Sequence, residues 1–254
     1  MKNITFLNIK GGVAKTTSSV AVAQILSSEY GKRVLLIDAD QQGNATMSLL
    51  GDAEPEYTTA DLLIKPELIA EKAVCHSKYG VDVIPACFDL SFANKQNLLD
   101  FSANRLLHLK MQMETLKDNY DYCIIDCPPD ISSAVMNALA MTDYVLIPVR
   151  ADKYGLDGLK YVQNAINDVF GINPQIEVLG LFLTMYQKRT NLTYFVRQIM
   201  TDYRFPVLAS SIRQSTSVGV STFGEPLMNY APHSAVADDY RELVKEIITK
   251  IKEK

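Results

Sequence analysis

The sequence predicts a single α/β domain over residues 1–254, built on a mostly parallel, twisted sheet with helices on both faces. Three observations predict it. Short apolar runs alternate with segments of helical periodicity along almost the whole chain. The chain has 254 residues, 48% of them hydrophobic, which is enough to bury one full core. A glycine turn joins the first apolar run directly to the first helical segment.

The elements are expected in strict alternation. Apolar strand-like runs lie at residues 4–9, 34–37, 81–85, 122–126, 144–149, 178–185 and 207–212. Helical segments follow them at 18–28, 46–50, 104–116, 132–141, 156–170 and 192–203, and in the last part of the chain. Strands connected in this way are expected to be parallel and buried on both faces. Residues 52–78 are the least periodic and are expected to cross the surface, with a short helix start at 58–61.

The turn after the first strand carries the strongest chemical signal. Paired glycines let successive backbone N–H groups point inward, and the first turn of the following helix adds unpaired donors and a positive dipole end. Lys15 is expected on the β- and γ-phosphates of a nucleotide, and the Thr16 hydroxyl on Mg²⁺. The expected nucleotide-binding residues are Lys10, Gly11, Gly12, Val13, Ala14, Lys15, Thr16 and Thr17.

Acidic residues follow two of the predicted strands. Asp38 and Asp40 come after the run at 34–37, and Asp126 ends the run at 122–126. Acids at the carboxyl ends of neighbouring strands can hold a metal ion and orient a water molecule. A lone Asp is more commonly a turn or cap residue, but two such sites in this order favour a P-loop ATPase.

These motifs resemble the ParA/MinD family of deviant Walker A ATPases. Residues 10–17 are similar to its Walker A box, 38–46 to its switch I box, and 124–129 to its Walker B and switch II box. Further similarities in family order lie at 83–86 with 89–90, at 148–149 with 154–159, at 183–186 with 189–192 and at 223–226, so the resemblance covers nearly the whole chain. It is closest to ParA/Soj partition ATPases of the short form, without an N-terminal helix-turn-helix.

The resemblance implies a role for each motif residue. Lys15 and Thr16 would bind phosphate and Mg²⁺, Asp126 would hold the metal through water, and Asp40, also on the metal side, would position the attacking water. Lys10 would reach across an ATP-bound homodimer to the partner's nucleotide and neutralise charge in the transition state. Lys10, Lys15 and Asp40 are therefore the expected catalytic residues.

The chain departs from the family at three positions. Gln41 stands where the family usually has proline, which removes a fixed φ from switch I. Ala14 stands where the family has glycine, so we expect a negative φ there, because a left-handed alanine costs about 1 kcal/mol or more. Asp130 adds an acid near switch II. None of these changes removes a catalytic group.

Nonspecific DNA binding, which the resemblance implies for the ATP dimer, needs several cations on one face. The candidates are Lys188, Arg189, Arg197, Arg204 and Arg213, of which Lys188, Arg189 and Arg213 are the expected contacts. A second arginine that the family often carries is Thr216 here, and the net charge is −4, which excludes a wholly basic DNA-binding protein. Each cation taken alone is more simply a solvated surface residue.

The remaining features bear on location. The four cysteines, Cys75, Cys87, Cys123 and Cys127, form no Cys-x-x-Cys pair, which counts against a zinc site, a redox pair or an iron–sulfur carrier of the nitrogenase iron-protein type. No signal peptide or membrane-spanning run is visible, so a cytoplasmic, nucleoid-associated protein is expected.

The last helical segment tests a MinD-like, membrane-cycling alternative. Its apolar positions recur at helical spacing, but acids are mixed with the lysines of its polar face, so we expect it to dock on the core and expect no membrane partner. The interpretation that remains is an ATP- and Mg²⁺-dependent dimerising switch that positions DNA or another cargo with a ParB-like partner. A protein that only binds ATP and acts as a scaffold is the nonenzymatic alternative.

Overall fold

The computed structural model describes residues 1–100, 104–152, 158–187, 196, 200 and 205–253. Within these residues the sheet has eight strands in the order β3-β4-β2-β5-β1-β6-β7-β8. The pairing of β3 with β4 is antiparallel, and the other six pairings are parallel. The predicted fold class is therefore confirmed.

The strands vary in length, and the first of them, β1, leads into the glycine loop. Their bounds are β1 (Lys2–Phe6), β2 (Val34–Asp38), β3 (Cys75–His76), β4 (Asp82–Ile84), β5 (Tyr122–Asp126), β6 (Tyr144–Arg150), β7 (Glu177–Tyr186) and β8 (Val207–Arg213). The helices are α1 (Lys15–Ser28), α2 (Asn44–Leu50), α3 (Thr59–Ile64), α4 (Leu90–Leu98), α5 (His108–Met113), α6 (Ser133–Met141), α7 (Leu159–Val169), α9 (Thr216–Ser221), α10 (Leu227–Tyr230) and α11 (Ala235–Lys252), with 3₁₀ turns η1 (Ala70–Ala73) and η2 (Glu114–Leu116).

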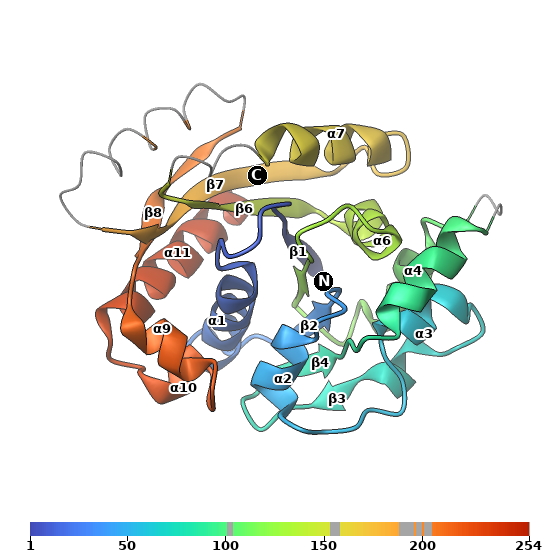
Figure 1. The fold of residues 1–254 in the computed structure, drawn as a ribbon, viewed down its shortest axis with the longest axis horizontal. Helices are drawn as coiled ribbons and strands as arrows, with labels where there is room; N and C mark the ends of the chain where they lie inside the picture. The colour runs from blue at the N-terminus through green and yellow to red at the C-terminus, as the bar shows by residue number, and fades with distance from the viewer. Residues whose placement is uncertain (101–103, 153–157, 188–195, 197–199, 201–204, 254) are drawn as a thin grey trace.

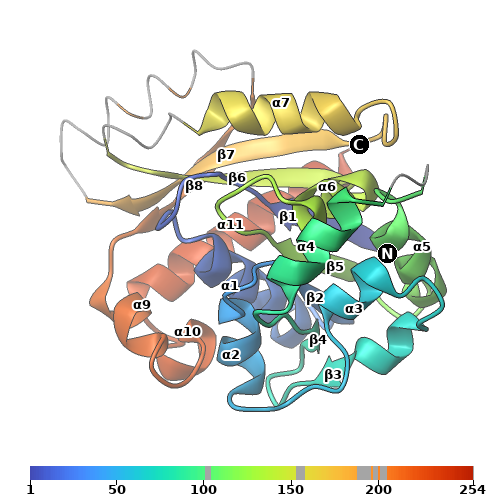
Figure 2. The same ribbon diagram turned by 45° about the vertical axis from the view of Figure 1, so that its right-hand side comes forward.

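Helices cover the sheet on both faces (Figure 1, Figure 2). Alternate residues of β2 divide between two hydrophobic clusters: Leu35 and Ile37 lie with α5, α6 and α7, whereas Val34 and Leu36 lie with α1 and α11. The two views agree that α7 and α11 lie on opposite sides of β6 and β7. Because side chains alternate across a strand, a sheet buried on both faces needs apolar residues at nearly every position, as β2 has.

The predicted strands are found, with ends shifted by up to three residues. The first helix begins at Lys15 and not at residue 18, because Ala14 is the last residue with a left-handed backbone and the chain is helical from the next residue on. Residues 52–78 are less irregular than expected, since Thr58 caps α3 in a capping box and α3 buries Leu62 and Leu63. Most of the expected helix at 192–203 lies outside the described residues.

The last helix docks on the core, as the sequence predicts. Its apolar face lies against α1 and β8, and the described side chains buried there are Val236, Tyr240, Leu243, Val244, Ile247 and Ile248. The hydroxyl of Tyr240 shares a hydrogen bond of 3.1 Å with that of Ser18 on α1. No helix among the described residues has the length and apolarity needed to cross a bilayer.

Candidate functional site

The loop between β1 and α1 is shaped to receive an anion. Gly12 and Ala14 both have positive φ, +68° and +65°, so the chain turns inward twice before α1 begins. Ala14 is the N-cap residue of α1 and offers no side-chain acceptor to the first turn. The N–H groups of that turn are thus available to a phosphate, and the helix dipole favours its charge. The expected negative φ at Ala14 was wrong.

Two hydrogen bonds to neighbouring strands and one within the loop hold it in place. The Thr184 hydroxyl on β7 donates to the carbonyl of Val13 at 3.1 Å. The Asn8 amide donates to the carbonyl of Pro148 on β6 at 2.8 Å, and its oxygen accepts the Lys10 N–H at 3.0 Å. The sequence analysis assigned no role to Asn8 or Thr184, because each acts through a partner that is distant in the chain.

The two loop lysines are already engaged within the chain. The Lys15 ammonium donates to the carbonyl of Lys10 at 3.1 Å and is only 7% exposed. Burial lowers its pKa, with Asp126 foremost among the charges that oppose the shift. The Lys10 ammonium lies 3.0 Å from the Asp152 carboxylate, which also binds Arg150 at 2.9 Å. Asp152 is a site residue that no sequence motif indicated.

Asp38 and Asp126 end adjacent strands and are direct partners in the register of β2 with β5. The Asp38 carboxylate accepts the N–H and the hydroxyl of Thr46, at 2.9 and 2.8 Å, and the N–H of Asp40 at 3.1 Å. Burial raises its pKa, and these hydrogen bonds oppose the shift. Asp38 is thus occupied as a structural acceptor that holds the start of α2.

Asp126 differs from Asp38 because it is fully buried and neither carboxylate oxygen accepts a hydrogen bond within ordinary geometry. Burial raises its pKa, the charge of Asp38 adds to the shift, and the nearby hydroxyls of Thr16 and Ser19 oppose it. A buried carboxylate without donors is costly unless a cation neutralises it. The side chains of Asp126 and Thr16 are oxygen ligands of the kind that Mg²⁺ prefers, so the site fits this metal.

Asp40 lies in the tight turn that follows β2. Its carboxylate accepts the N–H of Gln42 at 2.9 Å, and its carbonyl accepts the N–H of Gly43 at 2.9 Å. Gly43 has φ +62°, and a Cβ there would lie 2.9 Å from the carbonyl oxygen of Ala86. The turn therefore requires glycine at 43, and it keeps Asp40 near Lys15, whose pKa it affects.

The predicted DNA contacts are only partly visible. Lys188, Arg189, Arg197 and Arg204, and residues 153–157 of the family-like motif, lie outside the described residues. Arg213 ends β8 and is bound in a fork by Asp239 on α11, with Nε–Oδ2 at 2.6 Å and Nη2–Oδ1 at 2.5 Å. The hydrogen bonds that Arg213 donates to Asp239 raise the pKa of Arg213. The sequence did not predict this pair.

The chain is similar to known proteins over nearly its whole length. A family model described as an AAA domain matches residues 1–178. The sporulation initiation inhibitor protein Soj of Bacillus subtilis is 36% identical over 97% of this chain and 98% of its own length. The chromosome partitioning protein ParA of Caulobacter vibrioides is 33% identical over 98% of this chain and 95% of its own length.

A similar solved structure is that of cobyrinic acid a,c-diamide synthase from Mycobacterium smegmatis with bound ADP and magnesium. It matches with a TM-score of 0.87 at 30% sequence identity, covering 99% of this chain and 96% of that one. The likeness therefore extends over the sheet and both helical layers.

Proposed function

Because the chain belongs to the Soj/ParA family of partition ATPases, we propose that it is a nucleotide-dependent switch that positions DNA or another cargo. It is a P-loop ATPase, and its ATP and Mg²⁺ requirement follows from its similarity to structures with ADP or an ATP analogue and magnesium. The observation that carries the proposal is the Asp126 carboxylate, buried without a hydrogen bond beside the loop that bears Lys15 and Thr16.

The residues divide the work of hydrolysis. Backbone N–H groups of residues 11–17 bind the phosphates, Lys15 neutralises the β- and γ-phosphate charge, and Thr16 and Asp126 hold the metal. Mg²⁺ held there by Thr16 and Asp126 would neutralise charge that develops on the phosphate oxygens. Asp40 orients the attacking water, and its turn keeps it close to Lys15.

Lys10 is proposed to act in a homodimer. Its ammonium leaves Asp152 and contacts the nucleotide of the partner, so ATP becomes part of the interface and its hydrolysis loosens the pair. Each nucleotide site of the dimer would thus be completed by Lys10 from the other copy.

The ATP dimer is proposed to bind DNA nonspecifically and to release it when a ParB-like partner stimulates hydrolysis. Dimerisation doubles the number of cations on one face, which suits a backbone-directed, salt-sensitive interaction. Lys188, Arg189 and Arg213 are the proposed contacts. The Asp239 carboxylate already accepts two side-chain N–H groups of Arg213. Arg213 would therefore contact DNA through its remaining guanidinium N–H groups, or after its ion pair with Asp239 breaks.

The test is binding to random-sequence duplex DNA with ATP, ADP or no nucleotide across a salt series. ATP alone is expected to give binding whose log affinity falls linearly with log salt. Asp40→Ala should retain this binding, whereas Lys10→Ala and Arg213→Ala should lose or weaken it. Lys72→Ala, which removes an exposed charge on η1, is the matched control and should bind normally.

One outcome would redirect the proposal. If ATP drives dimerisation but no nucleotide state binds DNA, the DNA assignment falls, and binding to liposomes becomes the next measurement for the MinD-like alternative. The docked apolar face of α11 speaks against that alternative, because membrane insertion would expose a large part of the core.

A further inference from the structure

Helix α6 begins at the end of the loop 127–132, which itself begins directly after Asp126. Its N-cap residue, Ser132, makes no capping hydrogen bond, and the Ser132 hydroxyl has no partner. The cap comes instead from α4. The side-chain oxygen of Asn94 accepts the N–H of Ala134 at 2.8 Å, and that of Asn97 accepts the hydroxyl of Ser133.

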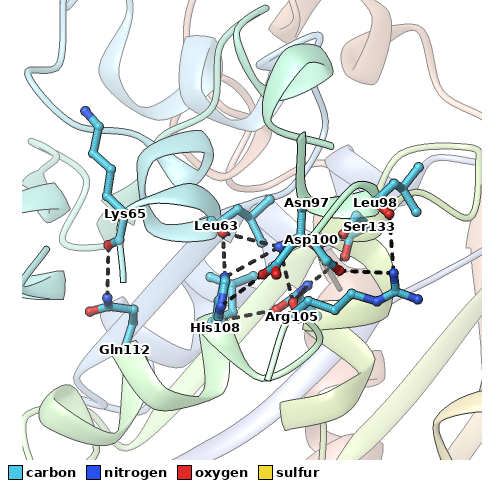
Figure 3. A network of polar contacts seen from close by, with 11 residues as sticks. Leu63, Lys65, Asn97, Leu98, Asp100, Arg105, His108, Gln112 and Ser133 are labelled. Carbon is cyan, nitrogen blue, oxygen red and sulfur yellow. Dashed lines mark hydrogen bonds and ion pairs between the residues drawn. The ribbon is translucent and has the colours of Figure 1, made fainter. Parts of the chain in front are cut away.

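The neighbouring Asn97 is itself held rigidly. It is buried, and its amide donates to the carbonyl of Leu63 on α3 at 3.3 Å and to that of Arg105 at 3.2 Å. Figure 3 shows Asn97 between Leu63, Arg105 and Ser133, at the centre of this network. The helix that supplies the cap therefore cannot rotate without breaking several buried hydrogen bonds.

The other end of α4 connects to the first acidic loop. Ala86, four residues before α4, donates its N–H to the Thr46 hydroxyl at 2.9 Å, and that hydroxyl donates to Asp38 at 2.8 Å. The segment that leads into α4 is thus hydrogen-bonded to α2, which follows the loop that carries Asp40, and α4 itself is hydrogen-bonded to the first turn of α6, which follows Asp126.

We propose that Asn94 is a positioning residue for ATP hydrolysis. By accepting the N–H of Ala134, it fixes the first turn of α6 and hence the loop that sets the direction of the Asp126 side chain. The inference rests on the proposed role of Asp126 at the metal. Asn94 itself touches neither nucleotide nor metal in this scheme. An acceptor at a helix N-terminus is worth about 1 kcal/mol, which corresponds to roughly fivefold in an equilibrium or rate constant.

The test compares steady-state ATP hydrolysis by Asn94→Ala, Asn94→Asp and Gln96→Ala, the last being an exposed amide on the same helix. Asn94→Ala should lower kcat by about fivefold while KM for ATP changes little, because the phosphate-binding loop is untouched. Asn94→Asp keeps the acceptor and suits the helix dipole, so it should restore kcat. Gln96→Ala should resemble the unaltered protein.

Amide hydrogen exchange supplies a readout that does not depend on turnover. Exchange should accelerate at residues 130–135 in Asn94→Ala and return to normal in Asn94→Asp. A folded Asn94→Ala protein with unchanged kcat overturns the inference. If Asn94→Ala does not fold, Asn94→Leu, which keeps a similar side-chain volume but has no acceptor, takes its place, and normal kcat there has the same meaning.

Asp126→Ala, measured in parallel, separates the two proposals. Normal hydrolysis by Asp126→Ala would remove the proposed site itself. An inactive Asp126→Ala beside a fully active Asn94→Ala would remove only the positioning role of Asn94.

Discussion

The backbone of Ala14 has φ +65° and ψ +34°, a conformation that suits glycine. This conformation costs alanine about 1–2 kcal/mol, a cost that glycine would not have. Glycine is also more flexible in the unfolded chain, which lowers the stability of the Ala14→Gly variant by about 0.4–1 kcal/mol and so offsets part of the gain. Ala14→Gly should therefore raise the free energy of unfolding by roughly 0.5–1 kcal/mol in denaturant titrations.

The matched control is Ala235→Gly, at an exposed position in the first turn of α11. There the backbone is right-handed, so glycine should lower stability by up to about 1 kcal/mol. Equal effects of the same sign at both positions would contradict the explanation from backbone strain.

Asp126 should make the metal-free protein less stable as the pH rises. Burial raises its pKa above the value in the unfolded chain, so between these two values the folded state binds a proton that the unfolded state has lost. Stability therefore falls with rising pH through that window. Asp126→Asn should be more stable than the unaltered protein at neutral pH without metal, with a smaller pH dependence of the unfolding free energy.

Asp38 also has a raised pKa, so some pH dependence should remain in Asp126→Asn. Adding Mg²⁺ with ATP should stabilise the unaltered protein and have a smaller effect on the variant. Identical pH profiles for the two proteins, measured by thermal unfolding without metal, would show that Asp126 is not the group responsible.

At the scale of elements, α11 protects the edge of the sheet. The Glu246 carboxylate accepts the N–H groups of Ala209 and Ser210 on the edge strand β8, at 2.9 and 2.8 Å, and the Ser210 hydroxyl at 2.6 Å. Burial alone would raise its pKa, but these hydrogen bonds outweigh burial and hold the pKa below its usual range. One side chain thus satisfies backbone donors that an edge strand would otherwise expose.

Glu246→Ala should lower the free energy of unfolding by about 1–3 kcal/mol, because it leaves these donors without an acceptor. It should also increase aggregation on heating, which light scattering would detect. Because the pKa of Glu246 is depressed, its contribution is complete above the ordinary glutamate pKa and is lost as the pH falls. Glu253→Ala, just beyond the end of α11, should have little effect, and a comparable loss there would argue against the edge contact.

Helix α4 and strand β3 were not predicted from the sequence, each for its own physical reason. Helix α4 exposes Phe92 and leaves Leu99 after it 73% exposed, while Asn94 and Asn97 face its neighbours. Apolar residues lie on its buried side, as Leu90 and Ala93 do, as well as on its exposed side, so periodicity could not find it. Strand β3 has two residues, too few for any pattern.

At the scale of the whole molecule, local motifs predicted the parts of the site that follow directly from strand ends. The glycine loop, Asp40 and Asp126 meet at the carboxyl ends of the central strands, because β1, β2 and β5 are parallel neighbours. The ion pairs of Lys10 with Asp152 and of Arg213 with Asp239 join residues that are distant in the chain. No spacing rule predicts such pairs, since only the folded sheet brings them together.

The pair of Lys10 with Asp152 should also govern assembly. If Lys10 must leave Asp152 to enter a partner's site, Asp152→Asn should favour the ATP-bound dimer. A partly exposed ion pair is worth about 0.2–1 kcal/mol, so a dimerisation constant should increase by up to about fivefold for each lysine released. Sedimentation at several protein concentrations with ATP and with ADP would measure it.

Asp52→Asn removes an exposed charge outside the loop and serves as the matched control. Weaker dimerisation by Asp152→Asn would mean that Asp152 supports the interface instead of competing with it. If Asp152→Asn also strengthens dimerisation when it is introduced into the Lys10→Ala variant, the effect belongs to another partner of Asp152, such as Arg150.

The sheet also limits how copies of this protein can grow into larger arrays. One border is a strand of two residues, β3, and the other, β8, has backbone donors bound by Glu246 and Asp239. Neither border offers the long ladder of free backbone groups on which chains join strand to strand into fibrils. Association of copies would therefore have to proceed through loops and side chains and not through extension of the sheet.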